Sequence, residues 1–463
     1  MRRADPAGQI ISSASTRGTG TRPSQDPLAP VQVEPDPRRH FVLATLCVVA
    51  VVNMVDRQII TIVLEPIKAE FGASDTAMGL LTGMIFAAFY ATAAFPIARW
   101  ADGGSRKVVL AACLGFWSLM TTLGGIAQSF IQLAITRVGV AIGEAGAGPT
   151  SQSMLSDLFP LSSRATVLAT LSAFSSFGIG LGVLLGGWLS DTFTWRTAFF
   201  IVGAPGLLLA AFVYRFLPEP RRGAADGLVD DEHAPRIRQA FAFLRKIPTY
   251  RHVVAIAAFV ALCGYGQLMW GPTFFRRVHD MTGTEAGAGF GLATMAAFML
   301  GSLTAGFISD WAGKKDIRWY MRIAAIGPAL GFPFGLLFVF APSATVALIA
   351  SFLFQFFVVF HNPPCYAIAQ TLAPLRMRAM AVVIIGLFQS LIGIGLAPIL
   401  IGAVNDFLEP QFGLEAIRYS LGVVMIGAVM AACVALRASF TIGSDHAQRQ
   451  RSATQESQTR GQV

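Results

Sequence analysis

The chain has 463 residues, of which 54% are hydrophobic and only 13% are charged, and its formal net charge is +9. This composition excludes an ordinary soluble domain and indicates an integral membrane protein. The basic residues lie between apolar runs rather than on one face or arm, so they favour a membrane address over a nucleic-acid partner. The five cysteines are scattered singly at no metal-ligand spacing, and we expect neither a metal nor another cofactor.

The first predicted segment, residues 1–37, is polar and too poor in apolar residues to fold, so we expect a disordered tail. The first apolar run begins near Phe41 and is too long for the h-region of a signal peptide. Windows of about 20 apolar residues, the length that a helix needs to span a bilayer, then recur along the chain. We predict twelve spans, near 41–63, 76–98, 108–127, 131–153, 166–189, 197–217, 251–272, 286–308, 320–341, 344–370, 380–403 and 417–437.

The longest loop between these windows, Pro218 to Pro248, separates six spans from six. The sequence therefore predicts one six-helix bundle over 38–217, a linker over 218–249 and a second bundle over 250–440. Within the linker, "RIRQAFAFLRKIP" sets apolar residues at helical spacing against basic ones. This pattern favours an amphipathic helix on the inner leaflet, with a solvated linker helix as the alternative. Residues 441–463 resemble the first tail and are also predicted to be disordered.

The distribution of Lys and Arg predicts the orientation. An even number of spans puts both termini on one side, and most of the 35 basic residues then share that side with the loops next to it. The bias predicts that both termini are cytoplasmic, and we expect a bacterial inner membrane. The exceptions are Arg57, Lys68, Arg137, Arg196, Arg276, Arg277 and Arg418.

The two sets of six spans resemble each other. "PLSSRATV" begins at Pro160 and "PLRMRAMA" at Pro374, 214 residues later. "PIARWADGGSRK" and "GFISDWAGKK" follow the second and eighth spans, and their aspartates, Asp102 and Asp310, are 208 residues apart. Two pairs at nearly the same offset indicate duplication, and repeated halves around a midplane site are a transporter architecture.

These loops resemble the signature of the major facilitator superfamily, and the similarity covers the chain apart from its tails. "LAITRVGVAIGEAG" is similar to the family's fourth-span motif, with Arg137 at the arginine position. "GVLLGG" resembles the fifth-span antiporter motif but has Val183 in place of proline. The resemblance implies an all-α integral membrane protein with twelve transmembrane helices in two pseudo-symmetric six-helix bundles.

Within the superfamily, "NMVDRQIITIVLEPIKAEFGASDTAMGLLTG" and "RVGVAIGEAGAGPTSQSMLSDLFP" look like the spinster branch. Members of known role export lysophospholipids and sphingosine phosphates, so the resemblance implies a lipid-like substrate. Related bacterial carriers share these motifs, and the resemblance does not reach as far as the substrate of this chain.

Three charged residues inside predicted spans need a partner, a water-filled cavity or a function, because charge is costly there. At 1.5 Å of rise per residue, Asp56 lies roughly 22 Å along the first span, and Arg137 and Glu144 lie about 9 and 20 Å along the fourth. Asp56 and Arg137 are then at similar depth, with Glu144 deeper on the same face as Arg137. We predict that the three residues form a proton relay. The alternative is that Asp56 and Arg137 only hold two helices together.

Other polar residues inside spans are candidates for the substrate cavity, although a packing role is at least as good an explanation for each. Asn53 is placed to orient Asp56, while Arg57 faces about 100° away from Asp56 and is expected to reach the outer side. The other candidates are Tyr265, Gln267, Trp270, His361, Asn362, Tyr366 and Gln389. We also predict that the two signature loops gate the inner side through Asp102, Arg106, Lys107, Asp310, Lys314 and Lys315.

These residues predict a monomeric secondary transporter for an amphiphilic or lipid-like solute, coupled to protons. Transport of small organic acids or drugs is the alternative within this class. A membrane receptor is the alternative from another class, although no sensory domain is attached. An enzyme is disfavoured because the sequence contains no HExxH, GxSxG or phosphate-binding GKS or GKT motif.

Overall fold

The computed structural model describes residues 37–221, 237–374 and 377–460. Within these ranges the chain is helical and contains no strand. The predicted tail over 1–37 lies outside the described residues apart from its last position, as do residues 222–236 of the predicted linker. Residues 35–463 form one compact unit.

The first half builds its spans from α1 through α9. Polar caps begin several of these helices: Ser129 Oγ, for example, accepts from the backbone N–H of Gln132, which satisfies one of the free donors at a helix start. The second span is continuous from Asp75 to Gly103 because a π-helical turn, η1, joins α3 to α4. The elements are α1 (Arg39–Ile62), α2 (Leu64–Phe71), α3 (Asp75–Gly79), η1 (Leu80–Met84), α4 (Ile85–Gly103), α5 (Arg106–Gly124), α6 (Phe130–Glu144), α7 (Ala147–Leu158), α8 (Leu161–Thr192) and α9 (Trp195–Phe216).

The second half repeats this plan after a short helix, α10, that lies within the stretch predicted to be amphipathic. A second π-helical segment, η4, interrupts the eleventh span, and the capping box of Thr282 and Glu285 begins the eighth. The elements are α10 (Ile237–Leu244), α11 (Pro248–His279), α12 (Gly283–Gly313), α13 (Arg318–Val339), α14 (Ala344–Val358), η2 (Val359–His361), α15 (Asn362–Leu372), α16 (Arg378–Gln389), η4 (Ser390–Leu396), α17 (Ala397–Phe412), η5 (Gly413–Glu415) and α18 (Ala416–Arg460).

Eleven helical stretches in the described residues are long and apolar enough to cross a membrane. The last of them, Met380–Arg451, contains two crossings, because the chain turns at Gly413, whose φ is 56°. Ser420 on one side of this turn donates to Asn405 on the other, and α17 packs along α18. The predicted windows 380–403 and 417–437 each fall on one arm of this hairpin, which gives the twelve spans of the predicted fold.

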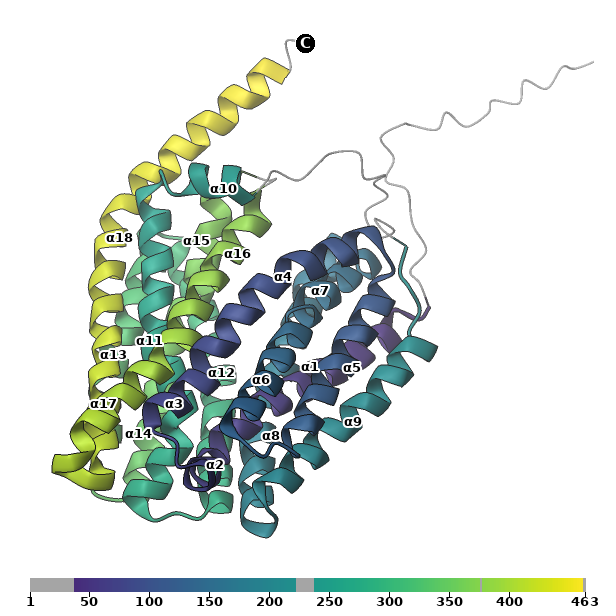
Figure 1. Ribbon diagram of the computed structural model, residues 1–463. Coiled ribbons are helices and arrows are strands. Elements are labelled where there is room, and N and C mark those ends of the chain that lie inside the picture. The colour runs from purple at the N-terminus through teal and green to yellow at the C-terminus, as the bar shows by residue number, and fades with distance from the viewer. Residues whose placement is uncertain (1–36, 222–236, 375–376, 461–463) are drawn as a thin grey trace, which may run out of the picture. The chain divides into compact units, whose positions relative to one another are not determined.

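Residues 441–460 continue helix α18 where the sequence predicts a disordered tail (Figure 1). The backbone N–H of Thr249 donates to Asp445 Oδ2 at 2.8 Å, and the hydroxyls of Thr249 and Thr441 are 2.8 Å apart. A helix that is already nucleated in the membrane extends at little cost, and these bonds fix its extension to the start of α11. The prediction of a disordered tail is therefore wrong up to Arg460.

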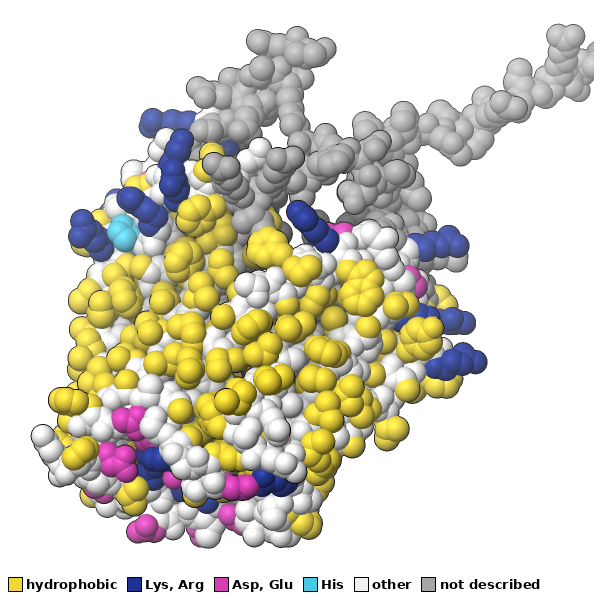
Figure 2. Space-filling model, in the orientation of Figure 1, with side chains coloured by type: hydrophobic (Ala, Val, Ile, Leu, Met, Phe, Trp, Pro, Cys, Tyr) yellow, Lys and Arg dark blue, Asp and Glu magenta, His cyan; other side chains and the backbone are white. Residues whose placement is uncertain are grey.

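Hydrophobic side chains form a broad band across the face shown in Figure 2, between two charged margins. Large apolar residues such as Phe307, Phe407 and Phe440 are more than three-quarters exposed in the isolated chain. Apolar surface on this scale is expected where lipid covers a protein. The chain is therefore an integral, multi-pass membrane protein.

Helices of the two halves pack against each other most extensively at two places, α8 against α12 and α17 against α3. Both crossings lie near the ends of helices that are remote from α10 (Figure 1). We call this end, formed by Asp75, Thr192, Gly283 and Phe412 and their neighbours, the clasp end. The opposite end, which carries α10, is called the linker end.

Candidate functional site

A cluster of four charged side chains lies inside the first half, on α1 and α6. Arg57 Nε donates to Glu144 Oε2 at 2.8 Å, and the hydroxyl of Thr121 on α5 donates to Asp56 Oδ1 at 2.5 Å. Asp56, Arg137 and Glu144 are each only 1% exposed. The cluster holds two carboxylates and two guanidinium groups, so its formal charges balance.

The cluster leaves much of its hydrogen-bonding capacity unused. Asp56 Oδ2, Glu144 Oε1 and both Nε and Nη1 of Arg137 are buried with no hydrogen-bond partner in the structure. Unpaired buried polar atoms are costly, and they are uncommon except at functional sites or where water or a ligand binds. The two carboxylates are therefore able to exchange partners or take up a proton, and Arg137 is able to exchange partners, without first breaking a saturated network.

One aromatic ring contacts both guanidinium groups. The Cζ atoms of Arg57 and Arg137 lie 5.0 and 5.7 Å from the centre of the Phe86 ring, and Arg57 also lies 5.5 Å from the ring of Tyr90. Phe86 is 1% exposed, and the Phe86 and Tyr90 rings stack on α4. A cation over a desolvated ring is stabilised by about 2 kcal/mol. Phe86 was not predicted from the sequence because a phenylalanine in an apolar span is usually a packing residue. Its spacing of four from Tyr90, which puts both rings on one helix face, was the pattern that could have indicated it.

The pairing inside the cluster differs from the predicted one. Arg57 was expected to reach the outer side, but it turns to Glu144. Asp56 and Arg137, expected at one depth, form no ion pair among the described residues, although they interact electrostatically. Rise along a helix axis places Cα atoms only, whereas a guanidinium group reaches more than one helical turn from its backbone. Asn53, predicted to orient Asp56, is buried, and its Nδ2 has no partner.

The glycines beside Glu144 allow α6 to approach α5 closely. A Cβ on Gly143 would lie 2.7 Å from Cβ of Trp117, and one on Gly146 would lie 2.6 Å from the sulfur of Cys113. Gly148, by contrast, has open space beside it. Helix α6 ends at Glu144 and α7 begins at Ala147, so the carboxylate lies at a break in the fourth span. Close packing holds this break against α5 and fixes the position of Glu144.

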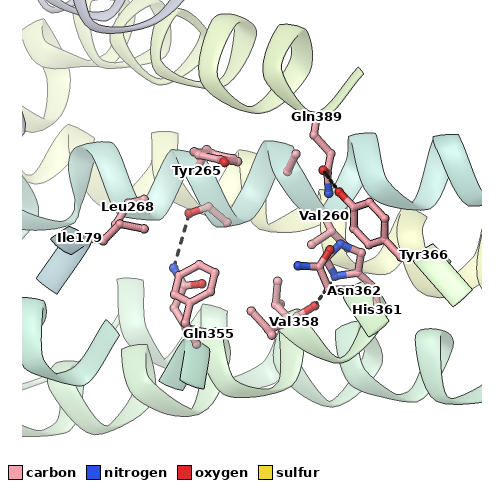
Figure 3. Close-up of a pocket in the computed structure, with 14 residues that line it drawn as sticks. Ile179, Val260, Tyr265, Leu268, Gln355, Val358, His361, Asn362, Tyr366 and Gln389 are labelled. Atoms are coloured by element: carbon pink, nitrogen blue, oxygen red, sulfur yellow. Dashed lines mark hydrogen bonds between the residues drawn. The ribbon is translucent and has the colours of Figure 1, made fainter. Parts of the chain in front are cut away.

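A cavity of about 280 Å³ lies in the second half (Figure 3). Five of the predicted cavity residues line it, together with Gln355, which was not predicted. The Tyr366 hydroxyl donates to Gln389 Oε1 at 2.9 Å, while His361 Nε2 and Asn362 Oδ1 are buried without a partner. The lining is Ile179, Val260, Ala261, Gly264, Tyr265, Leu268, Phe298, Gln355, Val358, Val359, His361, Asn362, Tyr366 and Gln389.

Tyr265 connects this cavity to the charged cluster. It lies on α11, packs against the hydrophobic cores of both halves and interacts electrostatically with Arg57. Ile179 on α8 is the cavity's contribution from the first half. The cavity and the cluster are therefore neighbouring parts of one candidate site, with charge on one side and neutral polar groups on the other.

Four predicted cavity residues do not line this cavity: Asn53 and Arg57 lie on α1, and Gln267 and Trp270 lie on another face of α11. Gln267 is fully buried and donates to Ser351 on α14 at 3.1 Å, and Trp270 donates to the carbonyl oxygen of Pro398 at 3.2 Å. At about 100° per residue, Gln267 and Trp270 point roughly 200° and 140° away from Tyr265. They do not line the cavity in this structure because only one face of α11 borders it.

The signature loop of the first half binds within its own half. Arg106 is 3% exposed and contacts Ser153, Asp157, Glu219 and the carbonyl oxygen of Pro220. The backbone N–H of Lys107 donates to Glu219 Oε2 at 2.8 Å. Burial raises the pKa of Glu219, but hydrogen bonds from Ser105, Lys107 and Arg106 outweigh it, so the pKa is lower than usual. The loop thus closes α5 onto the segment after α9.

The second signature loop is more exposed. Tyr320 donates to Asp310 Oδ1 at 3.1 Å, and Lys315 Nζ lies 4.6 Å from the centre of the Trp311 ring. Asp102 and Lys314 are both exposed. These bonds also stay within one half. The gating role of the two loops remains a prediction.

Charged residues that sequence reasoning did not select join the halves at the clasp end. Arg277 on α11 forms ion pairs with Glu65 and Asp75 of the first half, each at 2.6 Å. Lys68 Nζ lies 2.7 Å from Asp75 Oδ1, and Arg276 donates to the carbonyl oxygen of Ile62 at 3.1 Å. In this state the clasp end is closed by contacts between the halves.

Comparison with known proteins identifies the family. Residues 46–398 match the sequence model of the Major Facilitator Superfamily. The chain belongs to this superfamily. Because its members move solutes across membranes, the chain is a transporter rather than an enzyme.

The relatives of this superfamily member include an efflux pump and a transport protein for an organic acid. An MFS-type efflux pump of Mycolicibacterium smegmatis is 33% identical over 387 residues, which cover 83% of this chain and 89% of the pump. The cis,cis-muconate transport protein of Acinetobacter baylyi is 26% identical over 84% of this chain and 91% of that protein. Spinster homolog 3 of Danio rerio is 29% identical over 57% of this chain and 53% of its own length.

A solved structure places this transporter in the spinster-like branch. The bacterial homologue of the human lysosomal transporter Spinster, in an inward-facing and unoccupied conformation, superimposes with a TM-score of 0.80. It is 30% identical, and the match covers 89% of this chain and 99% of that one. The fold of this chain, with its closed clasp end, therefore resembles that of an inward-facing spinster homologue.

Proposed function

We propose that this spinster-like transporter moves an amphiphilic, lipid-like solute and couples its movement to protons by alternating access. The observation that carries the proposal is the position of the four-charge cluster, with its unpaired buried atoms, beside a cavity that is lined by both polar and apolar side chains. In this proposal the linker end faces the cytoplasm, as the basic residues predict. The transporter works as a monomer.

The proton step centres on Glu144. A proton on Glu144 removes the charge that holds Arg57 and leaves a neutral acid with its second oxygen, Oε1, free to accept or donate. Arg57 is then held by the Phe86 and Tyr90 rings, and its guanidinium group is available to an anionic solute. Proton uptake and solute binding are coupled in this scheme because both change the partner of one side chain.

The solute step draws on both sides of the site. The second half supplies hydroxyl, amide and imidazole groups from Tyr366, Gln389 and His361, and aliphatic walls from residues such as Val260 and Leu268. A solute with a polar or phosphate-bearing head and an apolar tail satisfies both kinds of surface, with its head near Arg57. Lysophospholipids and sphingosine phosphates belong to this chemical class.

Transport of a small organic acid is the second candidate. Two guanidinium groups close together suit a dicarboxylate, a volume of about 280 Å³ holds a small molecule, and a relative is a cis,cis-muconate transport protein. The two candidates differ in the need for apolar walls, since a dicarboxylate gains nothing from them.

Counterflow in proteoliposomes distinguishes the candidates. Vesicles preloaded with unlabelled lysophospholipid, cis,cis-muconate or buffer are diluted into the labelled form of each solute, with and without an imposed pH gradient. We expect counterflow of the lysophospholipid, and gradient-driven movement that a protonophore abolishes. Counterflow of muconate alone would replace the lipid proposal, and flux that ignores the pH gradient would remove proton coupling.

A further inference from the structure

Two carboxylates at the clasp end cap helices of the opposite half. Asp191, at the end of α8, accepts from the backbone N–H groups of Gly283 at 3.0 Å and Thr284 at 2.6 Å, at the start of α12. Asp406, near the end of α17, accepts from the backbone N–H groups of Asp75 and Thr76, both at 2.8 Å, at the start of α3. Each half therefore supplies the cap for the second span of its partner half.

The two caps occupy equivalent positions in the duplicated halves. Thr76 and Thr284 are 208 residues apart, the same offset as Asp102 and Asp310. Asp191 and Asp406 are 215 residues apart, one more than the offset between Pro160 and Pro374. The duplication that relates the signature loops thus relates the caps as well. In each cap one aspartate carboxylate accepts two consecutive backbone N–H groups of the opposite half.

Glycines beside the caps bring the crossing helices into backbone contact. A Cβ on Gly187, one turn before Asp191, would lie 2.1 Å from the carbonyl oxygen of Gly283. A Cβ on Gly402, one turn before Asp406, would lie 2.2 Å from the carbonyl oxygen of Asp75. Gly187 and Gly402 are again 215 residues apart. Such close approach leaves no room for side chains between the helices and presents each carboxylate to the free N–H groups of the helix it caps.

The first N–H groups of a helix have no partner inside the helix, and the helix dipole adds positive potential there. A carboxylate that accepts two of these N–H groups satisfies them only while the two halves are together. When the halves separate, water must replace the carboxylate at both helix starts. The ion pairs of Arg277 strengthen the α17 crossing alone, whereas the caps are common to both crossings.

We infer that Asp191 and Asp406 are a symmetry-related pair of positioning residues for the transport cycle: together they hold the clasp end closed, and both caps must release before that end opens. This inference uses only the contacts between the halves. It depends neither on the solute nor on proton coupling, so its failure and the failure of the proposed function are distinguishable.

Pulsed electron–electron resonance on the full chain in lipid nanodiscs tests the inference. Spin labels at Gln128→Cys, before α6, and Gln411→Cys, on α17, report the separation of the halves at the clasp end, since both residues are exposed there. The background is Cys433→Ser, because Cys433 is the exposed cysteine among the five. Distance distributions are compared for the parent, Asp191→Asn, Asp406→Asn and the double variant, with no solute and at one pH.

We expect each single variant to raise the ratio of open to closed populations by about tenfold, the effect of weakening hydrogen bonds to a charged group. Because the caps are equivalent, the two singles should match, and the double should shift the ratio by about the product of the two. Glu409→Gln removes an exposed carboxylate three residues from Asp406 and serves as the control for lost charge; we expect no shift.

An unchanged distribution in the double variant, a shift in only one single variant, or an equal shift in Glu409→Gln would overturn the inference. If an aspartate variant fails to fold, Thr76→Val provides a milder test. It removes the hydroxyl that donates to Asp406 Oδ2 at 2.5 Å but keeps the backbone cap. It should shift the ratio in the same direction by a smaller factor, and no shift in this variant would count against the inference.

Discussion

At the scale of single residues, the structure shows that Arg57 and Arg137 have different surroundings within one cluster. Arg57 has an ion-pair partner, whereas Arg137 is buried deeper and has unpaired nitrogen atoms. Removing one member of a buried pair leaves the other charge uncompensated, which typically costs 3 to 5 kcal/mol. Variants that keep shape while changing charge therefore separate function from folding in this cluster.

Glu144→Gln should abolish accumulation driven by a pH gradient while the protein remains folded. Glutamine keeps the size of a protonated glutamic acid and cannot exchange a proton, so counterflow of solute should survive while coupling is lost. Asp56→Asn should reduce coupling as well, with a smaller loss of stability, because Asp56 forms no ion pair among the described residues whereas Glu144 pairs with Arg57. Uptake into liposomes at matched protein incorporation provides the measurement. Normal gradient dependence in Glu144→Gln would show that this residue is not the coupling site.

Phe86→Leu should lower thermal stability by about 2 kcal/mol more than a comparable substitution elsewhere, because two guanidinium groups lose the ring that faces them. Phe290→Leu is the matched control: Phe290 is also fully buried but contacts no cation in the described structure. Phe86→Trp keeps an aromatic face and should retain more stability than Phe86→Leu. The variants are compared by thermal unfolding in detergent. Unfolding is monitored by labelling of buried cysteine thiols, because the Phe86→Trp variant would change a tryptophan fluorescence signal. Equal losses for the two leucine variants would exclude a cation–π contribution.

At the scale of elements, the second span shows how the fold combines local and distant interactions. Its start is capped from the opposite half by Asp406, and its end leads into the loop whose Arg106 binds Glu219 after α9. Pairing of Glu219 with this loop ties α5 to the chain segment that leaves the first half. Rigid-body movement of that half requires such ties within it.

Glu219→Gln should destabilise the first half in a pH-dependent way. The folded-state pKa of Glu219 is lowered, so its charged form stabilises the fold above the unfolded pKa of about 4.3, and this stabilisation is lost as pH falls through the folded-state value. Because the side chain is 34% exposed, we expect only about 1 kcal/mol at pH 7. Melting temperatures of the wild type and the variant should differ at pH 7 and converge toward pH 3, below the lowered pKa of Glu219. A difference that is the same at both pH values would contradict this role.

At the scale of the whole molecule, the clasp end is closed and the candidate site lies beside the contacts between the halves, an arrangement that the proposed alternating-access cycle requires. A solute that binds the site stabilises the folded state in proportion to its affinity and concentration. The cavity's apolar walls predict which solutes do so.

A long-chain lysophospholipid should raise the melting temperature, because its binding stabilises the folded state. At a concentration 100 times its dissociation constant, the free energy of unfolding should rise by about 2.7 kcal/mol. A hydrophilic sugar should have no effect, because it offers nothing to the apolar walls. Replacing Leu268, which lines the cavity, by Asn should weaken the response to the lysophospholipid. Melting is followed in nanodiscs rather than detergent, so that the lipid acts as a ligand and not as a micelle component. An equal response to lipid and sugar would reject the amphiphile proposal.

The sequence by itself determined the class of the protein, its spans and its repeated halves, because hydropathy and internal offsets are properties of local stretches. It also predicted that Asp56, Arg137 and Glu144 lie in one region, and it identified five of the residues that line the cavity. The two spans that flank the turn at Gly413 were also predicted from the sequence, since each of them is an apolar stretch long enough to cross the membrane.

Only the tertiary structure decided which charges pair and which helices touch. The pairing of Arg57 with Glu144 depends on side-chain direction and reach, and the burial of Gln267 and Trp270 depends on which neighbour each face of α11 meets. The caps formed by Asp191 and Asp406 join residues about 90 and 330 positions apart, at crossings that glycine makes possible. Such contacts leave no periodic signal in the sequence, because they arise only when two separately formed helices are packed together.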